Sequence, residues 1–165
     1  MEITLKMVEY GEKSVLSNLL EKYSYEFSQY DKLPFNRDGL YNYSYLDCYF
    51  TSENRFAYFI FADMQLIGFA MVSKRAECDR YADWSVAEFF VAYPYRRQGI
   101  GSSTIKRLFE MHRGIWHIKY HPYNLASKAF WTKIADRHAR GKYELTYGNE
   151  KYYDGTTPEV LVFRV

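Results

Sequence analysis

Residues 96–101 read Arg96-Arg97-Gln98-Gly99-Ile100-Gly101, and this stretch decides how the chain folds. An apolar run, Val86 to Ala92, precedes it, and a helix-compatible run, Ser102 to Arg113, follows it. A strand that leads through a tight glycine turn into a helix directs several backbone N–H groups towards one point. These donors, the positive helix end and the neighbouring arginines favour an anion, and a diphosphate is the natural guest. The alternative is a helix-capping turn with exposed arginines.

Two common phosphate-binding loops do not fit this turn. The sequence contains no G-x-x-x-x-G-K-[ST] pattern. A dinucleotide fingerprint would need a third Gly or Ala where Thr104 stands.

Composition sets the broad class of the protein. The chain has 165 residues with 48% hydrophobic and 25% charged residues, which predicts one globular domain over residues 1–165. The net charge of +2 is too small to indicate a nucleic acid or a membrane surface as partner. Cys48 and Cys78 form no disulfide framework, and neither cysteines nor histidines show metal-ligand spacing. The first residues lack the apolar core of a signal peptide, and the longest uncharged apolar run, Phe56 to Ala62, is too short to cross a membrane. We therefore expect a cytoplasmic protein without a metal.

Hydrophobic periodicity predicts an α/β fold with a mixed sheet. The run 84–92 is apolar almost throughout, which indicates a central strand covered on both faces. Residues 24–54 are polar and aromatic, and we expect short helices and loops there. The expected strands are 3–7, 57–62, 66–73, 84–92, 115–120, 143–147 and 160–165, and the expected helices are 13–23, 102–113 and 125–137.

Two motifs carry a family resemblance. Phe89-Phe90-Val91 followed by residues 95–102 resembles the central motif of the GNAT acetyltransferases. Asn124-Leu125-Ala126-Ser127-Lys128-Ala129-Phe130-Trp131 resembles their second motif, in the right order and at the right spacing. The resemblance covers roughly residues 57–135 and is nearest to a branch of predicted acetyltransferases with E-F-F-V, R-R-Q-G-I-G and F-W. It implies a GNAT fold, in which helices flank a mixed, mostly antiparallel sheet whose central strands splay apart at the cofactor.

The same resemblance implies acetyl-CoA as co-substrate. It assigns the pyrophosphate to backbone N–H groups of residues 97–102, and the pantetheine arm to the strand edge at Phe89 and Val91. A side chain on Gly99 or Gly101 would keep a phosphate away from the backbone. The expected cofactor-binding residues are Phe89, Val91, Arg96, Arg97, Gln98, Gly99, Ile100, Gly101, Ser102, Ser103, Asn124 and Trp131.

Glu88 is the candidate general base, because a carboxylate in an apolar central strand is costly unless it is paired or used. It is the one charge between Trp84 and Tyr95. Burial would raise its pKa towards the working range of a base. The alternative is a strand glutamate that faces water or pairs with an arginine.

Trp131 departs from the family pattern. Many GNAT enzymes have a tyrosine there that is proposed to protonate the leaving thiolate, whereas an indole N–H has no useful acidity. Either another tyrosine serves, such as Tyr120 or Tyr123, or the thiolate leaves unprotonated. The departure also leaves a second function open, a CoA-binding regulatory or structural protein without catalysis.

The acceptor side is expected in segment 23–56, which is rich in tyrosine in a chain with 20% aromatic residues. Tyrosine rings and a slight acidic excess favour a cationic amine. We therefore expect an N-acetyltransferase that acts on a primary amine of a small molecule or peptide. The family also suggests a homodimer. His117, His121 and His138 have no visible partner in the sequence, which favours surface or structural roles.

Overall fold

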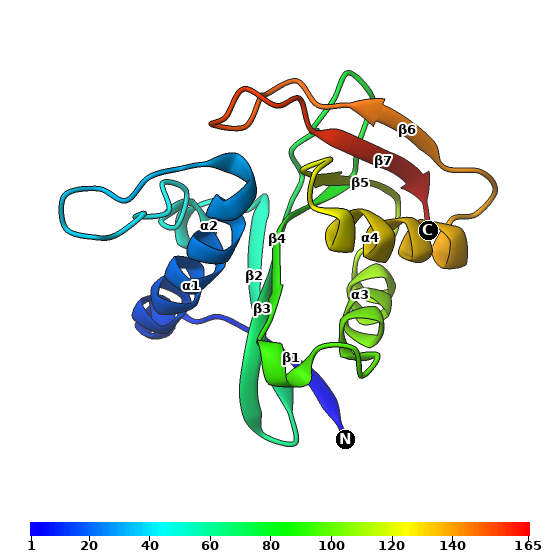
Figure 1. Ribbon diagram of the computed structural model, residues 1–165. Coiled ribbons are helices and arrows are strands. Elements are labelled where there is room, and N and C mark those ends of the chain that lie inside the picture. The colour runs from blue at the N-terminus through cyan, green and yellow to red at the C-terminus, as the bar shows by residue number, and fades with distance from the viewer.

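Seven strands and four α-helices make up the fold in a computed structural model that describes residues 1–165 (Figure 1). The strands are β1 (Ile3–Met7), β2 (Arg55–Ala62), β3 (Gln65–Ser73), β4 (Trp84–Val91), β5 (Ile115–Tyr120), β6 (Glu144–Tyr147) and β7 (Glu159–Arg164). The helices are α1 (Lys13–Asp31), α2 (Cys48–Thr51), α3 (Ile100–Met111) and α4 (Leu125–His138). Two short 3-10 helices, η1 (Tyr10–Glu12) and η2 (Tyr93–Tyr95), lie before α1 and α3.

The strands form one sheet in the order β1-β2-β3-β4-β5-β7-β6. Only β4 and β5 are parallel, and α3 makes the crossover that a parallel pair needs. All other neighbours are antiparallel. The predicted mixed, mostly antiparallel sheet flanked by helices is confirmed.

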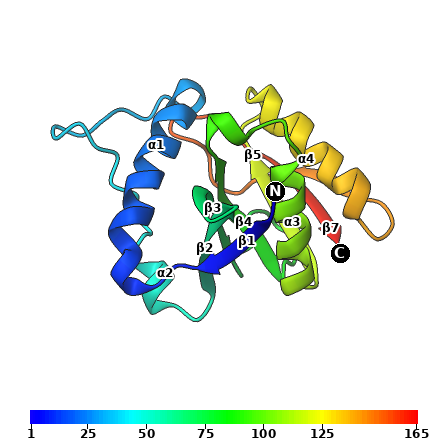
Figure 2. The same cartoon turned by 90° about the horizontal axis from the view of Figure 1, so that it is seen from below.

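Helices cover both faces of the sheet, α1 and α2 on one and α3 and α4 on the other (Figure 2). Successive residues of a strand therefore enter different cores: Tyr58 packs with the α3 and α4 side, and Phe59 with the α1 side. The same holds for β4, where Phe89 packs with the α3 and α4 side and Phe90 with the α1 side. This arrangement explains why residues 84–92 are apolar almost throughout.

The pairing between β4 and β5 is short. It joins Trp84, Ser85 and Val86 to Trp116, His117 and Ile118, and then it stops. β4 continues to Val91 with β3 as its neighbour on the other side. One edge of residues 87–91 is thus left without a strand partner in the middle of the sheet.

The expected elements are all present, with one large difference in length. α1 was expected to end at Tyr23 but runs to Asp31, because Tyr23, Phe27 and Tyr30 continue its aromatic stripe at helical spacing. It ends where Lys32 adopts a left-handed conformation, with φ of 63°. α3 starts at Ile100, two residues earlier than expected. No helix has both the length and the apolar character needed to cross a membrane.

Candidate active site

The turn between η2 and α3 is a cluster of free backbone donors. Arg97 and Gly99 have φ values of 62° and 78°, and Gly99 is the N-cap of α3. The backbone N–H groups of Arg97, Gln98 and Gly99 donate no hydrogen bond within the protein. Those of the first helical residues are free by helix geometry, since the first backbone bond into α3 comes from Ser103 to the carbonyl of Gly99 at 3.0 Å. The turn therefore presents donors and a positive helix end to one anion.

Gly101 has a packing role as well. A Cβ atom there would lie 3.2 Å from the Phe130 ring and 3.7 Å from the Phe89 ring. Those two rings stack on each other, with centroids 5.9 Å apart. A bare backbone at position 101 thus lets the start of α3 lie directly against the aromatic contact between β4 and α4.

The two arginines of the turn differ sharply. The guanidinium of Arg96 binds both carboxylate oxygens of Glu26 at 2.6 and 2.8 Å, and its Nε donates to the carbonyl of Val91 at 2.6 Å. The same group lies 4.1 Å from the centre of the Tyr93 ring. Arg97 is exposed and has no ion-pair partner. Of the two, Arg97 alone has a side chain free to meet an anion.

The other residues expected at the cofactor divide into backbone and side-chain candidates. Ile100 is buried in the core, so only its backbone faces the turn, while Ser102 and Ser103 are partly or fully exposed. Gln98 donates from its side chain to the carbonyl of Pro94 at 2.8 Å. The side chain of Asn124 caps α4 by accepting from the N–H of Ser127 at 3.0 Å, as its position before the helix predicts.

Trp131 is a packing residue at the open edge of β4. It is 5% exposed and its ring lies 5.6 Å from that of Phe89. Phe130 and Trp131 together cover the side of Phe89 that faces α4. The indole of Trp131 therefore packs against Phe89 on the α4 side and stabilises this part of β4.

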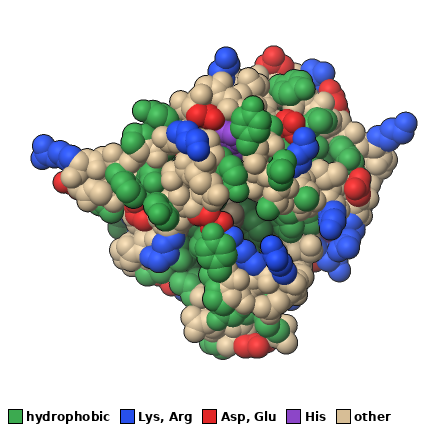
Figure 3. All heavy atoms as spheres, in the orientation of Figure 1, with side chains coloured by type: hydrophobic (Ala, Val, Ile, Leu, Met, Phe, Trp, Pro, Cys, Tyr) green, Lys and Arg blue, Asp and Glu red, His purple; other side chains and the backbone are tan.

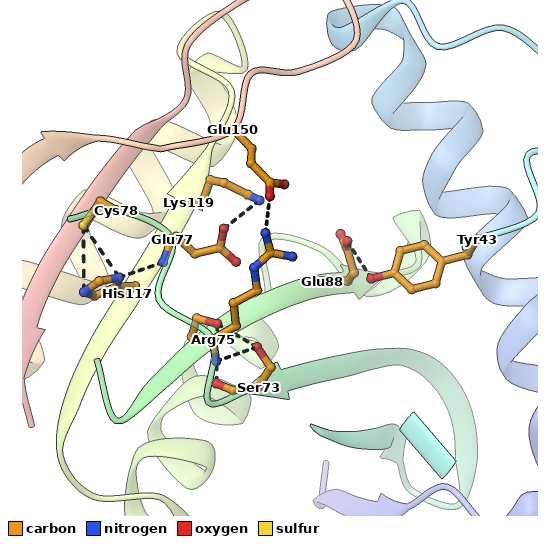
Figure 4. Close-up of polar contacts among 10 residues, drawn as sticks. Tyr43, Ser73, Arg75, Glu77, Cys78, Glu88, His117, Lys119 and Glu150 are labelled. Atoms are coloured by element: carbon orange, nitrogen blue, oxygen red, sulfur yellow. Dashed lines mark hydrogen bonds and ion pairs between the residues drawn. The ribbon is translucent and has the colours of Figure 1, made fainter. Parts of the chain in front are cut away.

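A β-bulge aims Glu88 at α1. Met71 lies opposite Glu88, but Val72 lies opposite Val86, so Ala87 is an extra residue in β4. In a regular strand Glu88 would share the α3 and α4 face with Val86. The extra residue turns it to the opposite face. There the hydroxyl of Tyr43 donates to Glu88 Oε1 at 3.1 Å (Figure 4).

The surroundings of Glu88 are aromatic and poor in charge. Burial raises its pKa, while the hydroxyls of Tyr23 and Tyr43 and the charge of Lys119 act in the other direction. Burial and then the nearby Glu88 charge also raise the pKa values of Tyr23, Tyr43 and Tyr152, and that of Tyr49 to about 12. These four tyrosines are neutral at physiological pH and enclose a carboxyl group that is more basic than usual.

The cations near Glu88 are already paired. Lys119 binds Glu77 at 2.9 Å, and Arg75 binds Glu150 (Figure 4). Glu88 itself has no ion pair. A directly bound arginine or lysine would lower the pKa of Glu88 and make it a weaker base. Glu88 has no such partner.

A groove lies beside η2, and its lining includes neither Glu88 nor the tyrosines around it. It has a volume of about 770 Å³ and lies between α1, the end of β4 and η2. Its walls include Tyr25 and Gln29 on α1, and Phe90 and Tyr93 on the other side. The space-filling view shows a hollow floored by hydrophobic side chains near the centre of the face seen in Figure 1 (Figure 3).

Comparison with known proteins decides the family. Residues 16–135 match the acetyltransferase (GNAT) family. The chain belongs to the GNAT acetyltransferases. No match is found among curated proteins.

Solved structures share the GNAT fold at low sequence identity. An acetyltransferase from Thermus thermophilus is 14% identical with a TM-score of 0.69, and the match covers 100% of this chain and 98% of that one. The PaiA N-acetyltransferase of Thermoplasma acidophilum in complex with coenzyme A is 13% identical with a TM-score of 0.63, covering 100% of both chains. NAA60 of Arabidopsis thaliana in complex with acetyl-CoA is 13% identical with a TM-score of 0.64, covering 99% of both chains.

The residues present fit a CoA thioester. The turn offers unused N–H groups where a diphosphate needs donors, and nothing lies within 4 Å of a Cβ built on Gly99. The unpaired edge of residues 87–91 offers backbone groups to an extended amide-containing arm. No group of His, Cys, Asp and Glu residues has the arrangement of a metal site.

His121 has a partner that the sequence does not indicate. It is fully buried, accepts from the N–H of Tyr123 at Nδ1, and lies 3.2 Å through Nε2 from Asp154. Its ring stacks on Tyr152 at 4.8 Å. The contact ties the loop between β6 and β7 to the end of β5, and no local pattern signals it, because Asp154 lies 33 residues further on.

Proposed function

We propose that this GNAT protein transfers the acetyl group of acetyl-CoA to a primary amine of a small molecule or peptide, with Glu88 as general base. The observation that carries the proposal is the position of Glu88. A bulge aims this partly buried carboxyl group at a tyrosine-lined face, beside the strand edge that has no partner. Buried carboxyl groups with raised pKa values are typical of catalytic bases.

Each part of the turn has a separate task in this proposal. Backbone N–H groups of residues 97–102 hold the diphosphate, assisted by Arg97 and the hydroxyls of Ser102 and Ser103. The edge at Phe89 and Val91 orients the pantetheine arm, and Trp131 supports that edge through Phe89. When bound, acetyl-CoA supplies an activated acetyl group as a thioester.

Glu88 prepares the acceptor. A primary amine arrives largely protonated and is attracted by the tyrosine rings and by the carboxylate. Glu88 removes one proton, directly or through a water molecule, and the amine becomes nucleophilic. A raised pKa makes the carboxylate a better proton acceptor than an ordinary glutamate.

The alternative function, CoA binding without catalysis, rests on Trp131. Neither tyrosine considered as a substitute acid is well placed. Tyr120 is 3% exposed, and burial and then Glu159 raise its pKa, whereas Tyr123 is 71% exposed. Departure of an unprotonated thiolate removes the need for such an acid, since a thiol has a pKa of about 8.5.

The test is an acceptor screen that follows thiol release from acetyl-CoA, run with the wild-type chain and Glu88→Gln. We expect Glu88→Gln to lower kcat by about 10²–10⁴ while acetyl-CoA affinity stays the same. Glu110→Gln is the matched control, because Glu110 lies on the surface of α3 and pairs only with Lys106. Normal turnover of Glu88→Gln from pH 6 to 9 would show that Glu88 is not the base. Tight acetyl-CoA binding with no acceptor in the screen would favour the alternative function.

A further inference from the structure

Glu88 makes one hydrogen bond with the rest of the protein, and it comes from Tyr43 at 3.1 Å. Tyr43 lies between α1 and α2, in a segment without regular secondary structure. A side chain on such a segment holds a partner in place only if its own backbone is fixed. The question is therefore what fixes Tyr43.

Glu21 on α1 fixes the backbone just before Tyr43. Its two carboxylate oxygens accept the backbone N–H groups of Tyr41 and Asn42, each at 2.9 Å. Asn42 has a left-handed conformation with φ of 51°, which costs free energy for a residue other than glycine. A two-pronged contact at this point stabilises a turn that would otherwise relax.

We propose that Tyr43 is a positioning residue that orients the Glu88 carboxylate through its hydroxyl, and that Glu21 holds Tyr43 in place through the two N–H groups that precede it. Glu21 and Tyr43 thus connect helix α1 to Glu88 on β4 through hydrogen bonds, an arrangement that we call the positioning relay; no proton moves along it. The inference rests on the proposed role of Glu88 as base.

The choice of a hydroxyl as partner has a chemical reason. A fixed cation would hold Glu88 deprotonated but weaken it as a base, whereas a neutral hydroxyl orients the carboxylate at a smaller loss of basicity. Every other titratable group near Glu88 is either a neutral tyrosine or a paired charge: Tyr23 from α1, Tyr49 from α2, Tyr152 from the β6–β7 loop, Lys119 with Glu77, and Arg75 with Glu150. Tyr49 has a buried hydroxyl without a hydrogen-bond partner. The hydroxyl of Tyr23 also lowers the pKa of Glu88, but the hydroxyl that donates a hydrogen bond to the carboxylate is that of Tyr43.

The test measures the titration of the Glu88 carboxyl group and needs no acceptor substrate. Carboxyl carbon shifts of ¹³C-labelled glutamate are followed by NMR against pH in the full chain, and the Glu88 signal is assigned by its loss in Glu88→Gln. Removing a donor to the charged form disfavours that form, so Tyr43→Phe should raise the titration midpoint by about one to two pH units. Glu21→Ala should raise it in the same direction although Glu21 does not touch Glu88.

Two further variants make the result decisive. Tyr41→Phe keeps the backbone N–H that Glu21 binds and should leave the midpoint unchanged. Glu21→Gln retains one acceptor oxygen and should raise the midpoint less than Glu21→Ala does. It also replaces the alanine variant as the test if that variant does not fold. An unchanged midpoint in Tyr43→Phe, or equal shifts in Tyr43→Phe and Tyr41→Phe, would overturn the proposal.

Enzyme kinetics separate this proposal from the proposed function. With an acceptor from the screen, the acidic limb of kcat/KM should move with the NMR midpoint in Tyr43→Phe. A midpoint that moves in a chain that acetylates nothing would support the relay and refute the transferase function. If turnover depends on Glu88 but the midpoint does not change in Tyr43→Phe, the transferase function is supported and the positioning role of Tyr43 is refuted.

Discussion

The ion pair between Arg96 and Glu26 links the turn before α3 to α1, and its loss should affect stability more than acetyl-CoA binding. Arg96→Ala removes two charged hydrogen bonds at 2.6 and 2.8 Å, a bond to the Val91 carbonyl at 2.6 Å, and a stacking contact with Tyr93. The two side chains are 31% and 26% exposed, so solvent weakens the pair and its share is about 1–2 kcal/mol. The carbonyl bond adds about 1 kcal/mol and the ring contact about 0.5–1 kcal/mol. Because these terms overlap, we expect Arg96→Ala to lower the free energy of unfolding by about 2–4 kcal/mol.

The assay is urea unfolding at pH 7 in a double-mutant cycle of Arg96→Ala and Glu26→Ala. The cycle should give a coupling energy of about 1–2 kcal/mol that decreases as salt is added. Arg97→Ala is the matched control: it should leave the free energy of unfolding unchanged and weaken acetyl-CoA binding by about 0.5–2 kcal/mol. A coupling energy of zero, or a larger loss of affinity in Arg96→Ala than in Arg97→Ala, would refute this reasoning.

Three further predictions follow from single contacts. Gly68→Ala should destabilise the fold by about 1–3 kcal/mol or more in thermal unfolding, because its Cβ would lie 2.0 Å from the Phe90 carbonyl oxygen, whereas Gly11→Ala meets nothing within 4 Å and should be mild. Glu88→Gln should leave stability equal or higher at pH 8, since a raised pKa means that the charged form is disfavoured in the folded state. That gain should vanish as the pH falls through the folded-state pKa to below 4.5, where Glu88 is neutral in both the folded and the unfolded chain. A stability difference between the variant and the wild type that stays constant with pH would contradict this prediction. Trp131→Phe should keep most of the turnover that an acceptor assay detects, because the indole packs on Phe89, and a collapse of kcat at unchanged acetyl-CoA affinity would assign it a catalytic role.

The local features of the fold were predictable from the sequence. The hairpin of β2 and β3, the central position of β4 and the Asn124 cap follow from patterns within a few residues, and the structure confirms them. The family motifs lie in the same part of the chain and led to the right family. The full length of α1 was missed because its last turns carry tyrosine and phenylalanine in place of aliphatic residues.

The environment of the site depends on contacts between distant segments, and those were not predictable. Tyr43 meets Glu88 across 45 residues, and Arg96 meets Glu26 across 70. The sequence also does not reveal the extra residue Ala87, because β4 carries apolar residues on both faces and has no clear alternation that would mark a change of register. The roles assigned to Glu88 and to the residues of the turn remain predictions that the experiments above address.

The short pairing of β4 with β5 gives the sheet a built-in reporter for hydrogen exchange. β4 pairs with β3 from Ser85 to Val91 except at the bulge residue Ala87, whereas the amides of residues 87–91 that point the other way face no strand. Neighbouring amides of one strand should therefore exchange with solvent at very different rates. Any molecule that lies along the open edge should slow only the second set. Hydrogen exchange at alternate residues of 87–91 thus reports directly whether a molecule lies along the open edge of β4, even a ligand that does not react.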